Sequence, residues 1–118
     1  MAVKLLLAGF NKYELEQLTD FANSQKIENI IIINKNDEEK IVGDLVKEAN
    51  IEINEILEEK LILFYGMTNK QITKFIDGYK KNKLDKPLFA VVTPHSIKWE
   101  LKTLLKHLNE ERKQMLKK

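Results

Sequence analysis

Four short runs of apolar residues, each followed by a stretch with helical spacing, constrain the fold of this chain more than any other feature. The runs are continuous rather than alternating, which is typical of strands that are covered on both faces, as in a parallel sheet. They are Val3–Ala8, Asn29–Ile33, Leu61–Tyr65 and Leu88–Val92. The stretches between them gather their apolar residues on one helical face. Strand and helix therefore alternate four times, which predicts an α/β domain with right-handed crossovers.

The chain also repeats itself. The segments KLLLAGFNKYELEQLTDFA and LILFYGMTNKQITKFIDGY align when Gly9 is matched with Gly66, and both read strand, glycine, apolar residue, cap residue and helix. We interpret residues 3–34 and 60–93 as two β-α-β units joined by a helix near 37–49. Chance similarity between two such units is the alternative.

No linker separates the two units, so we expect one sheet within a single domain spanning residues 1–118. The expected architecture has three layers, with a four-stranded, mostly parallel sheet in the order 2-1-3-4 and a C-terminal helix. The segment Ile51–Glu59 is ambiguous. It fits an extension of the preceding helix, a separate short helix or a loop.

Capping boxes mark the predicted helix starts. Asn11 with Glu14, and Thr68 with Gln71, have the spacing at which two side chains cap each other's backbone N–H groups. Asn36 with Glu39 offers a third box. In the stretch VTPHSIKW, Thr93 or Ser96 can cap the last helix, with Pro94 in its first turn.

A ligand site is expected where the strand order reverses, at the carboxyl ends of the first and third strands. In an all-parallel arrangement the loops at Gly9 and Asn11 and at Gly66 and Thr68 flank that point, and helix N-terminal amides there suit a phosphate or carboxylate. Residues Thr93, His95 and Ser96 follow the fourth strand and complete the candidate ligand-binding set.

No catalytic or metal-binding constellation is found in the sequence. His95 has no acid between Lys86 and Lys98 to orient it as a base, and His107 is too far along the chain to form a helical metal pair with it. The glycine-rich nucleotide motifs and CxxC are absent, so no cofactor is predicted. We interpret His95 as an exposed loop residue.

Trp99 is the residue that fits a simple core least well. If the last helix begins near Pro94, its apolar stripe passes through Ile97, Leu101 and Leu104, and Trp99 lies on the opposite side. An indole in that position packs on the adjacent loop, shields a neighbouring helix or contacts another molecule. We leave packing within the chain and contact with a partner open, and Trp99 is the candidate partner contact.

Charge is divided unevenly between the two halves. Residues 1–59 hold 6 lysines and 13 acids, whereas residues 60–118 hold 14 basic and 5 acidic residues. The halves can attract each other within or between chains, or form ordinary solvated helix faces. Only one of the 20 basic residues is arginine, so no nucleic-acid interface is expected.

The cellular compartment is suggested by two features of the composition. The chain has no cysteine, which fits a reducing environment. It also has no signal-peptide core and no apolar run long enough to cross a bilayer. We expect a cytoplasmic protein.

The C-terminal half resembles a known family. LFYGMTNKQITKFI followed by PLFAVVTPHSIKWELKTLLKHLNEER, about residues 60–112, is similar to a bacterial family of small proteins built on a domain of unknown function. The resemblance lies in a T-P-x-N-x-x-W pattern and a leucine-rich helix, at Ala90, Val91, Thr93, Pro94, Trp99, Leu104, Leu105 and Leu108. Ser96 stands where that pattern has asparagine, which favours a capping role because both are N-caps. The resemblance implies no activity.

The sequence thus predicts a non-enzymatic, cytoplasmic α/β domain that binds a protein partner or itself as a homodimer. The alternative function is binding of a small anion or nucleotide at the helix N-termini.

Overall fold

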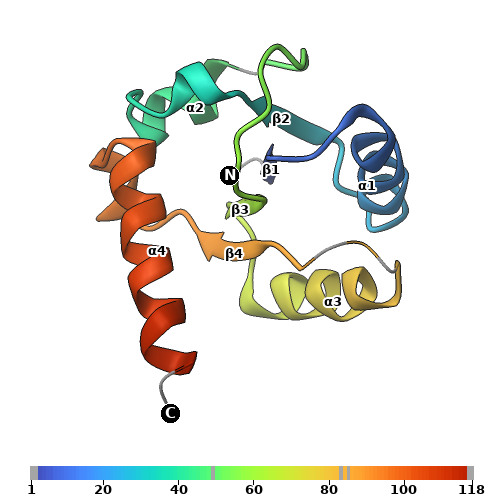
Figure 1. The fold of residues 1–118 in the computed structure, drawn as a ribbon. Coiled ribbons are helices and arrows are strands. Elements are labelled where there is room, and N and C mark those ends of the chain that lie inside the picture. Colours follow the sequence, from blue (N-terminus) through green and yellow to red (C-terminus); the bar gives the residue numbers. More distant parts are fainter. Residues whose placement is uncertain (1–2, 49, 83, 85, 117–118) are drawn as a thin grey trace.

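The computed structural model describes residues 3–48, 50–82, 84 and 86–116. The four strands of the sheet are β1 (Lys4–Ala8), β2 (Asn29–Ile33), β3 (Leu61–Tyr65) and β4 (Leu88–Val91). The four helices are α1 (Lys12–Ser24), α2 (Val42–Glu48), α3 (Asn69–Tyr79) and α4 (Leu101–Leu116). Short 3-10 turns lie at Lys35–Asp37, Lys80–Asn82 and Ser96–Lys98. Strands and helices alternate along the chain as the sequence predicts (Figure 1).

The strand order is β2-β1-β3-β4, which confirms the predicted order. The sheet is mostly parallel, because β1 pairs with β2, and β3 with β4, in parallel. The central pair of β1 and β3 is antiparallel, with Leu6 opposite Leu63. The carboxyl ends of β1 and β3 therefore lie at opposite edges of the sheet, which overturns the expectation that they meet at one point.

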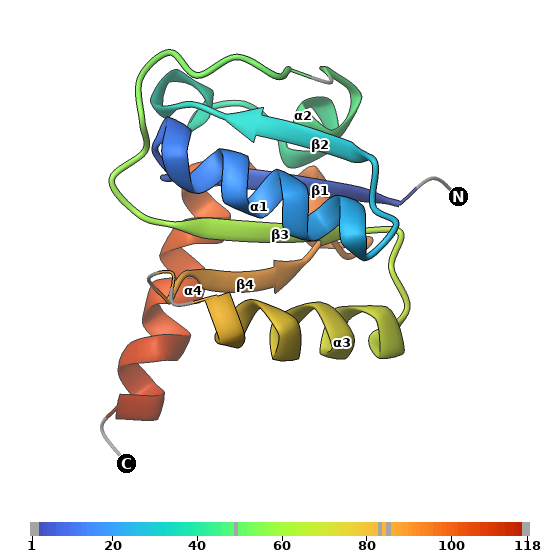
Figure 2. The ribbon, with the colours of Figure 1, turned by 90° about the vertical axis from the view of Figure 1, so that its right-hand side faces the viewer.

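Helices cover both faces of the sheet and give the three predicted layers. Figure 2 shows α1 and α3 on one face, with α2 and α4 behind the sheet. Successive residues of each strand point to opposite faces. Leu5 and Leu7 accordingly pack with α1 and α3, whereas Leu6 and Ala8 pack with α2 and α4. Burial on both faces explains why the strands read as continuous apolar runs.

The two β-α-β units are related by an approximate twofold axis. In the central strand pair, Lys4 lies opposite Tyr65 and Ala8 opposite Leu61, which is the pairing that a twofold through Leu6 and Leu63 requires. Corresponding registers are also kept within each unit. Leu6 pairs with Ile31 in β2, and Leu63 pairs with Ala90 in β4.

The duplication extends past the segments in which it was recognised. Val42 donates its N–H to the carbonyl of Trp99 at 2.9 Å, and Leu101 donates to the carbonyl of Lys40 at 2.9 Å. Since residue 40 corresponds to 99 and residue 42 to 101, these are one hydrogen bond and its symmetry mate. The repeats are therefore β-α-β-turn-α units, each ending in a helix on the second face.

The segment after α2 is an extended chain that returns along the outer side of β2 (Figure 2). Ile32 donates its N–H to Asn50 at 2.7 Å, and Lys35 donates to the carbonyl of Glu55 at 2.8 Å. The buried Asn34 donates from Nδ2 to the carbonyl of Glu52 and accepts from the N–H of Asn54. The loop alternative is thus confirmed for residues 51–59, and residues 50–55 of this stretch cover the edge of the sheet.

Candidate functional site

The corner at Gly9 is filled by protein. Gly9 has a φ of +82°, and a Cβ placed there would lie 2.1 Å from the carbonyl oxygen of Glu59. The first turn of α1 is also occupied, because Asn11 and Glu14 form the predicted capping box and Lys60 forms an ion pair with Glu14. Gly9 and Asn11 therefore serve the turn and the helix start, and the backbone of Glu59 and Lys60 takes the space that a ligand would need.

The other predicted ligand residues lie at the opposite edge, at the carboxyl ends of β3 and β4. Thr68 and Gln71 form the second capping box next to Gly66, which has a φ of +72°. Thr93 and Ser96 bond each other: the Thr93 N–H donates to Ser96 Oγ at 2.9 Å, and the Ser96 N–H donates to Thr93 Oγ1 at 3.0 Å. The side chains of Thr68, Thr93 and Ser96 therefore already accept hydrogen bonds from backbone N–H groups.

The single anion pocket that the sequence suggested is therefore not formed. Its residues divide into Gly9 and Asn11 at one edge, and Gly66, Thr68, Thr93, His95 and Ser96 at the other, because β1 and β3 are antiparallel. His95 is exposed, in agreement with its interpretation as a loop residue. Among the described residues, no group of three metal-ligating side chains is found.

Two details of the predicted caps are also wrong. The third box is formed by Asn34 with Asp37, the repeat equivalent of Thr93 with Ser96, rather than by Asn36 with Glu39. The Thr93–Ser96 pair starts a 3-10 turn, and α4 begins only at Leu101. Between them the chain is extended, since it forms an isolated antiparallel bridge to Ile41 at Glu100.

Trp99 consequently does not lie on α4. Its backbone is extended, with φ −87° and ψ 152°. Its indole stacks on the ring of His107 at a centroid distance of 4.7 Å and packs partly buried against the α2–α4 core. The structure thus shows intrachain packing for Trp99, against the last helix and the core between α2 and α4. Trp99 is only partly buried, so its exposed part stays the candidate partner contact.

The twofold relation explains what this stack replaces. Residues 40 and 48 of the first repeat correspond to 99 and 107 of the second, and there Lys40 donates to Glu48 at 3.2 Å. Lys40 also lies 3.0 Å from Asp37. Hydrogen bonds to Asp37 and then Glu48 hold the pKa of Lys40 above its usual range. In the first repeat the ion pair of Lys40 and Glu48 contacts the end of α2, and in the second repeat the stacked rings of Trp99 and His107 take the equivalent place on α4.

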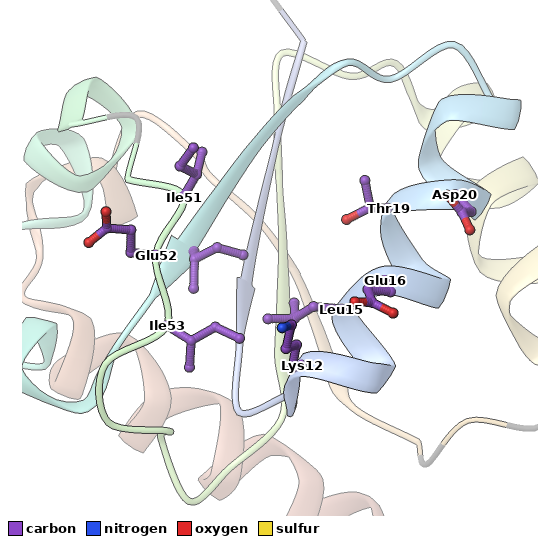
Figure 3. Close-up of a pocket in the computed structure, with 9 residues that line it drawn as sticks. Lys12, Leu15, Glu16, Thr19, Asp20, Ile51, Glu52 and Ile53 are labelled. Carbon is purple, nitrogen blue, oxygen red and sulfur yellow. The ribbon is translucent and has the colours of Figure 1, made fainter.

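An apolar groove runs between α1 and the returning segment, with a volume of about 770 Å³. Leu15 on α1 and Ile53 on the segment point toward each other from opposite walls (Figure 3). Ile32 also lines the groove, and Ile51 stands at its lip with 76% of its surface exposed. Burial of this side chain against another molecule would contribute about 1.5–3 kcal/mol.

Charges surround this groove. Its lining includes the carboxylates of Glu16, Asp20 and Glu52 and a single lysine, Lys12. All four residues are exposed. A groove with an apolar lining and a net negative rim suits a segment that is apolar on one side and basic on the other.

This groove was not recognised in the sequence. The alternating pattern Ile51-Glu52-Ile53-Asn54 was present as a signal, since alternation is typical of a strand with one face exposed. It was obscured because the segment pairs with β2 mainly through asparagine side chains and few backbone bonds. Asn50, for example, donates from Nδ2 to the carbonyls of Ile32 and Glu52.

None of the helices in the described part of the chain is both long and apolar enough to traverse a lipid bilayer. No curated protein and no solved structure is similar enough to the chain to count as a match. The model of a family described as "Domain of unknown function (DUF3783)" matches residues 60–115. This span begins one residue before β3 and ends within α4, so it coincides with the second repeat. From β3 to α4, the chain is thus similar to the DUF3783 domain, whose function is unknown.

Proposed function

We propose that this chain is a protein-interaction domain and that the groove between α1 and residues 50–53 is its binding surface. The observation that carries the proposal is the exposure of Ile51 beside the apolar lining of Leu15, Ile32 and Ile53. Large apolar side chains gathered at one exposed place commonly mark a contact site on a soluble protein. The first repeat holds the groove, and in the described part of the chain no equivalent of its second wall lies beside β4.

The partner that fits is a basic, amphipathic segment of another protein. Apolar side chains at helical spacing would enter between Leu15 and Ile53, while lysine or arginine would face Glu16, Asp20 and Glu52. The basic C-terminal half of a second copy offers the same chemistry, so a homodimer is the alternative occupant.

Titration of the isotope-labelled protein with a designed basic amphipathic peptide of leucine and lysine tests this proposal. The expected result is a set of amide shifts confined to α1 and residues 50–55, with binding weakened about tenfold by Ile51→Ser. Ile56→Ser is the matched control, because Ile56 is exposed on the same segment but does not line the groove.

Two results would contradict the proposal: shifts spread evenly over all acidic surfaces, or equal weakening by the two variants. Sedimentation of the protein without peptide separates the occupants. A concentration-dependent dimer that Ile51→Ser disrupts would identify a second copy as the occupant of the groove. A monomer at all concentrations would mean that the occupant is a different protein.

We further propose a cytoplasmic, bacterial setting for this interaction. The absence of cysteine from the sequence and the resemblance of the C-terminal half to a bacterial family support it.

A further inference from the structure

A second surface, at the other end of the sheet, has the properties of a docking site. β4 is an outermost strand, and among the described residues β3 is its only strand partner. Leu88 and Val92 donate their N–H groups to β3, to the carbonyls of Lys60 and Phe64. Because backbone groups alternate in direction along a strand, the N–H and C=O groups of Phe89 and Val91 point away from the sheet. Val91 is 42% exposed.

The outer edge of β2, which is the equivalent of β4 in the first repeat, shows what kind of segment such an edge binds. Residue 32 corresponds to residue 91, and the outward N–H and C=O groups of Ile32 are bonded by Asn50 at 2.7 and 3.1 Å. The occupant there is residues 50–55, N-I-E-I-N-E, an extended acidic segment with alternating isoleucines. This chain therefore already contains one example of the contact.

The second helices of the two repeats, α2 and α4, differ in length, and this difference explains why no described residue covers the outer edge of β4. α2 ends at Glu48, after which the chain turns back along β2. The residue equivalent to Glu48 is His107, but α4 continues to Leu116. No described residue returns to the outer edge of β4.

Charge distinguishes the two edges. Residues 80–98, which include β4, hold five lysines and one aspartate, whereas residues 50–59, which include the segment that covers β2, hold four glutamates and no basic residue. A second copy pairing β4 with β4 would bring two such basic segments together, which is unfavourable. An acidic segment would be attracted.

The strand is also ordered before anything binds. Phe89 stacks on Phe64 at 6.0 Å and meets Tyr79 edge-on at 5.5 Å, so β4 is fixed to the core from one face. Pro87 and Pro94 limit the accessible edge to about six residues. A rigid, short edge loses little conformational freedom on binding and suits a short peptide.

We propose that the outer edge of β4 binds an extended acidic segment of a partner protein, which adds to the sheet as a fifth strand. The outward N–H and C=O groups of Val91 form the central hydrogen bonds. Lys86 and Lys98, exposed on either side of the strand in sequence, favour the acidic side chains. This inference does not depend on the groove beside α1, which lies at the opposite edge.

The probe is a synthetic peptide with blocked ends and the sequence of residues 50–59, Asn-Ile-Glu-Ile-Asn-Glu-Ile-Leu-Glu-Glu. It is titrated into the isotope-labelled full chain. We expect the largest amide shifts at residues 88–92. A peptide with glutamine in place of its four glutamates should bind more weakly at low salt, and the difference should shrink as salt screens the lysines.

Val91→Pro is the decisive variant, since it removes the outward N–H while the inward hydrogen bonds to β3 remain. It should weaken binding about tenfold, the value of one hydrogen bond. Val91→Thr keeps the N–H and should bind like the parent chain. If Val91→Pro fails to fold, Lys86→Glu with Lys98→Glu is the second variant, and it should lower affinity for the acidic peptide only.

Three results would overturn the inference. Shifts confined to residues 30–35 would mean that the peptide only competes with the chain's own segment at β2. If the glutamine peptide binds as tightly as the glutamate peptide, the partner segment need not be acidic. Shifts at 88–92 that depend on protein concentration without peptide would identify self-pairing instead. Because Ile51→Ser leaves this edge intact, loss of groove binding and loss of edge binding are separately observed.

Discussion

At the scale of single residues, Gly9 is the most sensitive backbone position. We predict that Gly9→Ala lowers the free energy of unfolding by about 3 kcal/mol or more. The left-handed conformation costs a residue with a Cβ roughly 1–2 kcal/mol, and that Cβ would also collide with the carbonyl oxygen of Glu59. Urea denaturation followed by circular dichroism measures the change.

The companion variant Gly9→Asn separates the two causes. Asparagine tolerates the left-handed region better than alanine but has the same Cβ. If contact with Glu59 dominates, both variants are equally destabilised. A substantial recovery in Gly9→Asn would show instead that the backbone angle alone sets the cost.

Trp99 gives a second prediction at this scale. Because the indole stacks on His107 and packs on the α2–α4 core, Trp99→Ala should destabilise the isolated protein by about 1–3 kcal/mol. His107→Ala should cost less, since the indole keeps its core contacts. Thermal unfolding of the purified chain checks both. Unchanged stability in Trp99→Ala would point back to a partner contact.

Lys40 gives a prediction for pH dependence. Its pKa is raised by Asp37 and Glu48, so its charged form is favoured in the folded state. The stabilisation is fully present below the unfolded-state pKa of 10.5 and is lost as pH rises through the folded value. The stability difference between the parent chain and Lys40→Met should therefore shrink as the pH rises above 10.5 and the lysine loses its proton. A difference that persists there would be due to packing of the aliphatic stem.

At the scale of elements, sequence patterns located the strands and two of the helix starts, because capping boxes and apolar periodicity are local properties. The start of α4 was predicted too early. Thr93 and Ser96 have the side chains of a helix cap, but the chain must stay extended at Trp99–Glu100 to bridge Ile41. That bridge joins residues 59 positions apart, so no local pattern could reveal it.

The contact between α1 and α3 tests the duplication itself. Phe21 and Gly78 are equivalent positions of the two repeats, and a Cβ on Gly78 would lie 2.6 Å from Cζ of Phe21. Near a twofold axis, such positions meet each other and one large residue can be exchanged for the other. We predict that Phe21→Gly with Gly78→Phe together is more stable than the sum of the two single changes by at least about 1 kcal/mol. Chemical denaturation of the four proteins completes the cycle. Strict additivity would contradict the twofold packing.

At the scale of the whole molecule, the strand order and layers could be predicted, whereas the direction of the central pair could not. Leu5 and Leu7 are buried by α1 and α3 whether β3 runs parallel or antiparallel to β1, so the apolar pattern is the same in both cases. The wrong direction placed Gly9 and Gly66 at one edge and produced an anion pocket that does not exist. The groove and the open edge follow instead from the strand order, which places β2 and β4 at the two outer edges of the sheet.

The two edges of the sheet differ, since β2 is covered by residues 50–55 whereas no described residue covers the outer edge of β4. Hydrogen exchange of individual amides, followed by NMR in the free protein, measures this difference most directly. We predict slow exchange for Ile32, Ala90 and Val92 and much faster exchange for Phe89 and Val91. Protection of Val91 equal to that of Ile32 would mean that the edge of β4 is already covered, and would contradict the claim.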